Sequence, residues 1–161
     1  EQANIADKTL IVLSADHYPY GLTSEQINEL AGHKTEETFE IYESTLIIYA
    51  KGVKAQTIDK PCSGIDIIPT VSNLLGLEYD SRLLMGTDIF SDSPPLVIFA
   101  DRSFITDIGR YNARRLEFIA NEGVIPEDGY RNGISQIIDA KFAASAKILE
   151  LDYYSLLRQF L

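Results

Sequence analysis

An adjacent carboxylate and imidazole, Asp16 and His17, follow directly after an apolar run at residues 9–15. Aspartate oxygen and histidine nitrogen are ligands that suit Zn²⁺, Mn²⁺ or a similar divalent cation. In an open α/β sheet the carboxyl end of a strand faces the ligand crevice, so this position favours a metal site. Two ligands cannot hold a metal alone, and the others must come from elsewhere in this chain or from residues outside it.

These residues also have ordinary structural interpretations. Asp16 could cap a turn, and His17 could be a histidine that happens to end a strand. Tyr18 and Tyr20 follow the pair closely. They could line a crevice beside a metal, and packing with a hydroxyl hydrogen bond would explain them equally well.

Other chemically capable residues favour structural roles. His33 lies after a predicted helix, where the negative end of the helix dipole favours an imidazolium. Cys62 is the only cysteine and has no partner motif, which argues against a nucleophile. Asp66 is expected to start a helix, and Thr70 to be a structural helix residue.

The elements that would position the candidate ligands are a strand and short helices. The apolar run at 9–15 predicts the strand. Thr23 and Gln26 have the spacing of a capping box, which begins a helix that should end near Gly32. A second short helix is predicted to begin at Thr35, with acidic residues in its first turn.

The middle of the chain predicts a further strand and helix. Residues 44–50 are almost continuously apolar, which is typical of a strand buried on both faces of a parallel or mixed sheet. Apolar residues at helical spacing predict a helix over 65–76 that faces this sheet. Pro69 suits its first turn, and Gly76 suits its C-terminal cap.

The pattern changes after residue 94. Short strands are predicted at 96–100, 103–107 and 111–120, and the tight turns between them require antiparallel pairing. Residues 134–161 have helical apolar spacing with one break near Asp152. We therefore expect an α/β protein with a small C-terminal antiparallel sheet that carries a helix.

Composition limits the classes of function. With 161 residues, 45% of them hydrophobic, the chain can bury one sizeable core. Its net charge of −10 would repel a phosphate backbone, which argues against a nucleic acid partner. The sequence has no run of about 18 apolar residues, which is the length that a membrane-spanning helix needs. Its single cysteine excludes an internal disulfide framework.

Three motifs lie in order along the chain: Ala15-Asp16-His17-Tyr18, Asp66-Ile67-Ile68-Pro69-Thr70 with Leu74-Leu75-Gly76, and Met85-Gly86-Thr87-Asp88-Ile89-Phe90. Together they resemble the C-terminal part of the sulfatase family in the alkaline phosphatase superfamily, and most closely its lipoteichoic acid synthase type, the phosphoglycerol transferases of Gram-positive bacteria. The resemblance covers roughly residues 9–120. One departure is Ala15, where that family usually has glycine.

The resemblance implies part of an alkaline phosphatase-like α/β sandwich over residues 1–93, with the antiparallel subdomain and its helices over 94–161. It implies one divalent metal, Mn²⁺ or Mg²⁺ in preference to Ca²⁺, with Asp16 and His17 as two of its ligands. The family's early carboxylate and nucleophile match nothing here. We therefore expect no catalytic residue in this chain, a missing N-terminal half of the same domain, and no activity from the chain alone.

The implied function is transfer or hydrolysis of phosphate or sulfate esters at the extracellular face of a Gram-positive cell membrane. An alternative is a non-catalytic accessory or interaction domain whose acidic surface meets a partner. Because two strands make too small a sheet to be stable alone, we also expect the isolated chain to self-associate.

Overall fold

The computed structural model describes residues 5–159, and the chain divides into two compact units that meet between Ile58 and Asp59. The division falls earlier in the chain than the predicted boundary between residues 93 and 94, which stays a prediction. Within residues 5–159, no helix is long and apolar enough to cross a membrane.

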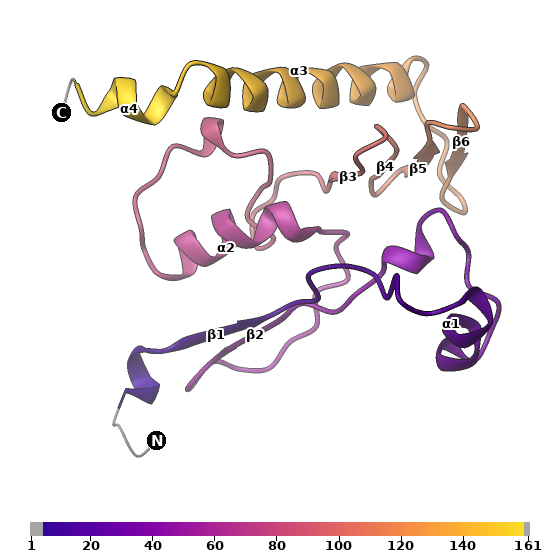
Figure 1. Ribbon diagram of the computed structural model, residues 1–161, viewed down its shortest axis with the longest axis horizontal. Helices are drawn as coiled ribbons and strands as arrows, with labels where there is room; N and C mark the ends of the chain where they lie inside the picture. The colour runs from indigo at the N-terminus through magenta and orange to yellow at the C-terminus, as the bar shows by residue number, and fades with distance from the viewer. Residues whose placement is uncertain (1–4, 160–161) are drawn as a thin grey trace. The chain divides into compact units, whose positions relative to one another are not determined.

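The first unit is built on a two-stranded antiparallel sheet (Figure 1). β1 (Leu10–Leu13) pairs with β2 (Ile47–Ala50), from Leu10 opposite Ala50 to Leu13 opposite Ile47. The sequence predicted a parallel or mixed sheet, and the pairing of these two strands is antiparallel. A parallel connection needs a crossover helix packed on the sheet, and the helix between these strands, α1 (Ser24–Ala31), buries no residue.

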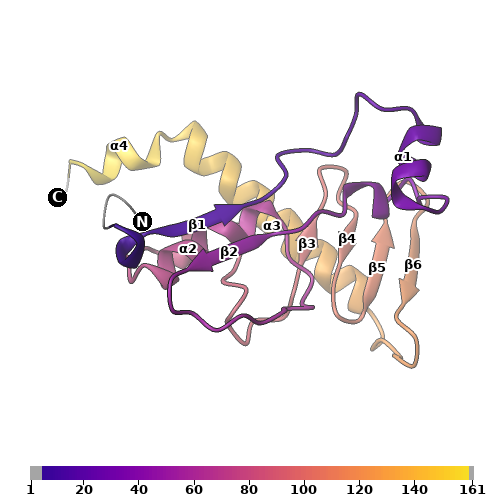
Figure 2. The ribbon, with the colours of Figure 1, turned by 90° about the horizontal axis from the view of Figure 1, so that it is seen from below.

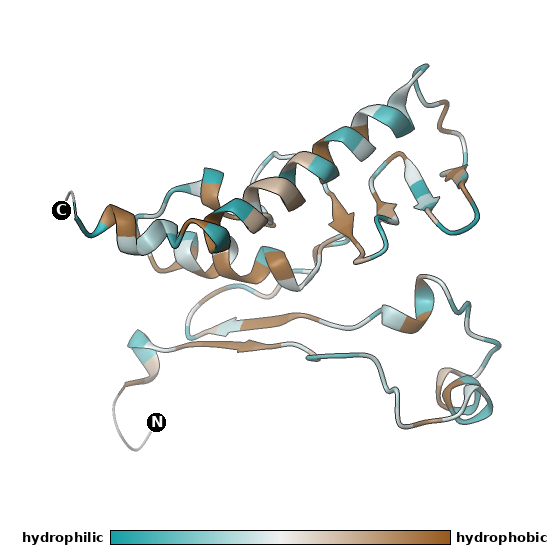
Figure 3. Ribbon diagram, turned by 45° about the horizontal axis from the view of Figure 1, so that its top comes forward, coloured by the Kyte–Doolittle hydropathy of each residue, from teal (hydrophilic) through white to brown (hydrophobic). Residues whose placement is uncertain are grey.

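One face of this sheet is apolar and exposed. Ile11 and Tyr49 form one cross-strand pair on it, and Leu13 and Ile47 form the next. These four side chains belong to residues that are 45–57% exposed. In Figure 3, β1 and the first part of β2 are brown, the colour of hydrophobic residues, and the end of β2 is paler. The predicted burial of the strands on both faces is therefore not seen in the described chain.

The capping box that predicts α1 is confirmed. The Thr23 hydroxyl accepts the Gln26 N–H at 3.3 Å, and the Gln26 side chain accepts the Thr23 N–H at 2.9 Å. Gly32 ends the helix in the left-handed region, with φ of 75°. Glycine adopts this conformation without the steric cost of a Cβ atom.

The helix predicted from Thr35 is wrong, because only a 3-10 turn forms, at Glu40–Tyr42. The Glu36 carboxylate accepts hydrogen bonds from the N–H groups of Thr38 and Phe39, at 2.9 and 2.7 Å. A side chain that satisfies successive N–H groups offers the backbone an alternative to a regular helix. The segment is therefore a compact loop with one helical turn.

In the second unit, α2 (Ile67–Leu74) follows a 3-10 turn and has Pro69 in its first turn, as predicted. Gly76, with φ of 65°, ends it. The Gly76 N–H donates to the Asn73 carbonyl at 3.0 Å, and the Leu77 N–H donates to the Ser72 carbonyl at 2.9 Å. This pair of bonds is the Schellman arrangement, which satisfies carbonyls at the end of a helix.

Four short strands form an antiparallel sheet in the order β3-β4-β5-β6 (Figure 2). They are β3 (Val97–Ile98), β4 (Phe104–Ile105), β5 (Gly109–Asn112) and β6 (Glu117–Ala120). The predicted antiparallel sheet is confirmed, but the single strand expected at 111–120 is two strands. The Asn112 side chain turns the chain between them, because its oxygen accepts the N–H groups of Arg114 and Arg115 at 3.0 Å.

A long helix packs on this sheet and closes the core. α3 (Tyr130–Glu150) is separated from α4 (Tyr153–Leu157) at Asp152, where φ is 44°, so the predicted break is confirmed. The predicted apolar position 160 lies outside the described residues. The core cluster consists of Phe104, Tyr111 and Ile138, with Leu96, Ile98, Ala113, Phe118, Ile134 and Phe142 packed against it.

Helices and sheets together confirm the α/β fold class and the C-terminal antiparallel sheet with its helix. The buried core lies in the second unit, since the first unit buries only Phe39 among the apolar residues described. The candidate ligands therefore belong to the unit with the smaller core.

Candidate metal centre

Asp16 and His17 lie on the loop that leaves β1 and leads to α1. The Asp16 side chain is 90% exposed and that of His17 is 50% exposed, so both are open to a ligand from solvent or from another segment. The His17 Nε2 atom is 3.4 Å from Asp16 Oδ1. The two potential donor atoms thus point toward the same region of space.

The other ring nitrogen of His17 holds the imidazole in place. Nδ1 lies 2.7 Å from the Tyr18 carbonyl oxygen. Because a carbonyl only accepts, Nδ1 must carry a proton and donate it, so a neutral His17 ring has its lone pair on Nε2. Metal-binding histidines usually donate their second ring N–H to a carbonyl or carboxylate in this way.

A cluster of three tyrosine rings lies beside this histidine. Tyr20 stacks obliquely on His17, with ring centroids 4.4 Å apart. Tyr18 makes edge contacts with Tyr20 at 6.1 Å and with Tyr42 at 5.1 Å. Edge-to-face contacts of this kind are favourable and orient the rings. The tyrosines therefore pack against one another beside the candidate ligands.

The donor pair fits half of a metal site. Two ligand atoms that each lie about 2.1 Å from an ion are about 3.4 Å apart in tetrahedral coordination and about 3.0 Å apart in octahedral coordination. The observed Asp16 to His17 separation is 3.4 Å. Among residues 5–159, no group of three or more His, Cys, Asp or Glu side chains could hold a metal ion. Further ligands of these types for such an ion would have to come from outside residues 5–159.

The second and third sequence motifs meet at a hydrogen-bonded junction in the other unit. Buried Asp66 accepts the Thr87 N–H at 2.7 Å through one oxygen and the Ser63 N–H at 2.8 Å through the other. The Thr70 hydroxyl donates to the Asp66 carbonyl at 2.6 Å and accepts the Ile89 N–H at 3.0 Å. These residues hold the 85–90 loop against α2.

Gly86 allows the close approach at this junction. A Cβ atom at Gly86 would lie 2.1 Å from the Ile65 carbonyl oxygen, far inside van der Waals contact. Two side chains add longer links to the same loop: Asn73 donates to Asp88 at 2.8 Å, and Lys141 of α3 donates to the Met85 carbonyl at 2.6 Å. The sequence identified the motif at 85–90 but not its structural role. That role arises because this loop packs against a segment about 20 residues earlier in the chain.

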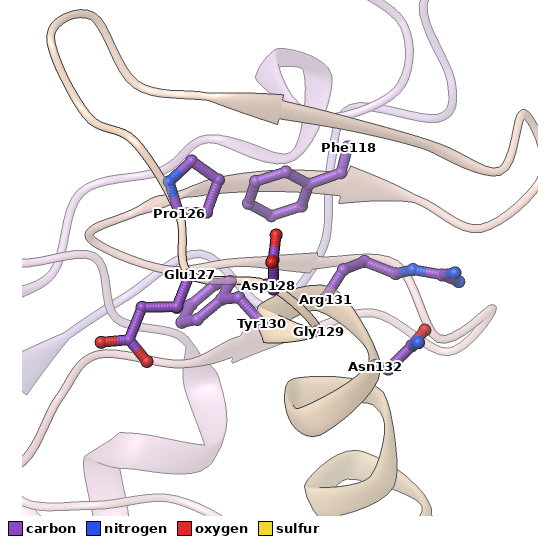
Figure 4. A pocket seen from close by; sticks show the side chains of 8 residues that line it. All are labelled: Phe118, Pro126, Glu127, Asp128, Gly129, Tyr130, Arg131 and Asn132. Atoms are coloured by element: carbon purple, nitrogen blue, oxygen red, sulfur yellow. The ribbon is translucent and has the colours of Figure 1, made fainter.

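A separate hollow lies at the start of α3 (Figure 4). Glu127 and Arg131 point to opposite sides in this view. The Arg131 guanidinium is engaged with Tyr111, whose hydroxyl accepts a hydrogen bond at 3.3 Å. The hollow contains no motif residue, and its two carboxylates disfavour an anion. Its lining consists of Phe118, Pro126, Glu127, Asp128, Gly129, Tyr130, Arg131 and Asn132.

His33 and Cys62 behave as structural residues. His33 contacts Glu40, and this hydrogen bond is the main cause that raises the His33 pKa. Partial burial of the Cys62 thiol, with a smaller contribution from the nearby Asp66 carboxylate, raises its pKa. A raised thiol pKa lowers the thiolate fraction and so disfavours a nucleophile, although the Cys62 residue as a whole is exposed.

No model of a known protein family matches the sequence. The chain is 31% identical over 107 residues to Lipoteichoic acid synthase 2 of Bacillus subtilis, a stretch that makes up 62% of this chain and 16% of that protein. The chain is related to the lipoteichoic acid synthases. It is also 28% identical over 115 residues to the Lipoteichoic acid synthase of Staphylococcus saprophyticus, which covers 69% of this chain and 18% of that protein.

This relationship confirms the resemblance to the lipoteichoic acid synthase type that the motifs indicated. A second kind of relative is the Low-salt glycan biosynthesis sulfotransferase Agl7 of Haloferax volcanii, 28% identical over 133 residues, or 80% of this chain and 31% of that protein. The matched stretches therefore span less than a third of the length of these relatives.

Proposed function

We propose that this chain is part of a metal-dependent enzyme of the lipoteichoic acid synthase type, which transfers phosphoglycerol groups or hydrolyses related phosphate or sulfate esters at the cell surface. The observation that carries the proposal is the pair of donor atoms on the β1 loop, 3.4 Å apart, where the Tyr18 carbonyl favours the neutral His17 tautomer that has its lone pair on Nε2. The relationship to lipoteichoic acid synthases supports the choice of phosphoglycerol transfer.

Asp16 and His17 would supply two ligands to Mn²⁺ or Mg²⁺, with Ca²⁺ as an alternative. Such an ion lowers the pKa of a nucleophile and neutralises charge that develops on phosphoryl or sulfuryl oxygens. The Asp16 carboxylate contributes the negative charge that a divalent cation needs, and His17 contributes a neutral nitrogen in a defined orientation. The nucleophile and the remaining ligands would come from residues outside this chain.

The test is the metal content of the full-length protein and of two variants. In Asp16→Ala one proposed ligand is lost, and we expect the affinity for Mn²⁺ to fall at least about tenfold. Glu37→Ala is the matched control, because it removes an exposed carboxylate from the same unit. Equal metal binding by both variants would exclude the site and would favour the alternative, a non-catalytic accessory domain.

A further inference from the structure

A second histidine in the same unit forms an ion pair that joins two segments. The His33 Nε2 atom contacts the Glu40 carboxylate, and His33 Nδ1 lies 3.1 Å from the Ala31 carbonyl oxygen. Both ring nitrogens therefore face acceptors. Only an imidazolium donates from both nitrogens, so this geometry requires a positively charged His33.

Glu40 connects this charge to the 3-10 turn at Glu40–Tyr42. Its second carboxylate oxygen accepts the Glu36 N–H at 2.8 Å. Two charged groups act on the Glu40 carboxylate: the His33 ring that it contacts and the Glu36 carboxylate. The pair therefore ties the end of α1 to the turn.

The last residue of that turn, Tyr42, contacts Tyr18, the residue that follows the candidate ligand His17. The Tyr42 ring makes an edge contact with the Tyr18 ring, with centroids 5.1 Å apart and planes at 76°. Tyr18 is also the residue whose carbonyl accepts the His17 Nδ1 hydrogen bond at 2.7 Å. A displacement of the Tyr42 ring would thus move the residue that sets the His17 tautomer.

We propose that His33 and Glu40 are positioning residues for the metal ligand His17, acting through the contact between Tyr42 and Tyr18. The ion pair holds the turn, the turn holds Tyr42 against Tyr18, and Tyr18 keeps His17 in the tautomer that frees Nε2. This inference rests on the proposed metal-binding role of His17. Because the tautomer exists without metal, the two proposals are tested separately.

The experiment is nitrogen NMR of this chain with labelled histidine and no metal, since His17 and His33 are its only histidines. At neutral pH we expect His17 to carry its proton on Nδ1. In Glu40→Gln and in Tyr42→Leu, we expect this form to lose its predominance, with a shift toward protonation on Nε2. Glu37→Gln, the control, removes a nearby exposed charge and should leave the His17 tautomer unchanged.

A pH profile separates positioning from a general structural role. As pH rises through the raised pKa of His33, the wild-type ion pair is lost, and the share of neutral His17 that carries its proton on Nδ1 should fall with it. In Glu40→Gln this step should be absent. Amide signals of α1 and of the core around Phe104 report that each variant is folded.

An unchanged His17 tautomer in both folded variants would overturn the inference, as would a wild-type His17 that carries its proton on Nε2. Mn²⁺ titration of wild type and Asp16→Ala in the full-length protein then tests the proposed function alone. If Mn²⁺ binds wild type and Asp16→Ala equally well and the tautomer effect is confirmed, the metal role is overturned and the coupling through Tyr42 remains.

Discussion

Thr70 is a fully buried hydroxyl with one donor and one acceptor role. It donates to the Asp66 carbonyl and accepts the Ile89 N–H, so it links two turns of backbone that are 19 residues apart. A threonine hydroxyl within a helix often returns to the carbonyl four residues earlier. Here the same oxygen also satisfies an N–H from another segment.

Thr70→Val keeps the side-chain volume and removes both hydrogen bonds. We expect the second unit to lose about 1–3 kcal/mol of unfolding free energy, because the buried Ile89 N–H is left unpaired. Urea unfolding followed by circular dichroism measures this change. Thr70→Ser keeps the hydroxyl and should recover most of the loss that comes from the hydrogen bonds; equal losses in both variants would show that the hydroxyl is not the cause.

The ion pair of His33 and Glu40 predicts a pH dependence for the first unit. Its contribution is fully present below the ordinary His pKa of 6.5 and is lost as pH rises through the raised pKa of His33. At low pH it is lost again as Glu40, whose pKa is lowered mainly by the Glu36 N–H, becomes protonated. Protection factors for amide exchange in the Glu40–Tyr42 turn should therefore be highest between these limits, and Glu40→Gln should flatten the profile.

At the scale of elements, the junction between α2 and the 85–90 loop depends on backbones that approach closely. The Asp66 carboxylate accepts the N–H of Ser63, which precedes the helix, and the N–H of Thr87, which lies in the loop. The backbone of Ile65 leaves no space for a side chain at Gly86. A motif that places glycine next to a buried carboxylate acceptor thus serves packing. The family motif is accounted for here without any contact with substrate.

Gly86→Ala should separate these two elements. The added Cβ would lie 2.1 Å from a backbone oxygen that cannot rotate away, and we expect a loss of about 3 kcal/mol or more from the strain. Gly64→Ala is the control, because nothing lies within 4 Å of its added Cβ. Thermal unfolding compares the two, and similar melting temperatures would contradict the close approach.

At the scale of the whole molecule, the two units differ in how much apolar surface they bury. The second has the cluster around Phe104 and Ile138, whereas the first leaves an apolar sheet face exposed. Monomeric proteins rarely expose large contiguous apolar patches. The face formed by Ile11, Leu13, Ile47 and Tyr49 is therefore a candidate for contact with other protein surface.

We predict that the isolated chain self-associates through this face. Sedimentation equilibrium should show a mass that rises with concentration, and Leu13→Thr combined with Ile47→Thr should reduce the association. Leu149→Thr, which changes an 80% exposed leucine on α3, is the control and should have no such effect. A strictly monomeric, cooperatively folded wild-type chain would contradict the prediction.

Local features were predictable from sequence because their energies depend on neighbouring residues. The capping box at Thr23, the glycine end of α1 and the break at Asp152 each involve hydrogen bonds or backbone angles within a few residues. The candidate ligands belong to the same class, since Asp16 and His17 are adjacent. The helix expected from Thr35 failed because the Glu36 side chain competed for its N–H groups.

Tertiary structure decided the features that join distant segments. The antiparallel pairing of β1 with β2 depends on how a linker of more than 30 residues returns the chain, and an apolar strand carries no direction of its own. The bond from Asp66 to Thr87 spans 21 residues, and the contact from Tyr42 to Tyr18 spans a loop, a helix and a turn. The sequence by itself therefore determined the helix ends and the candidate ligand pair, whereas the strand directions and the supports of those ligands required three-dimensional proximity that no local pattern encodes.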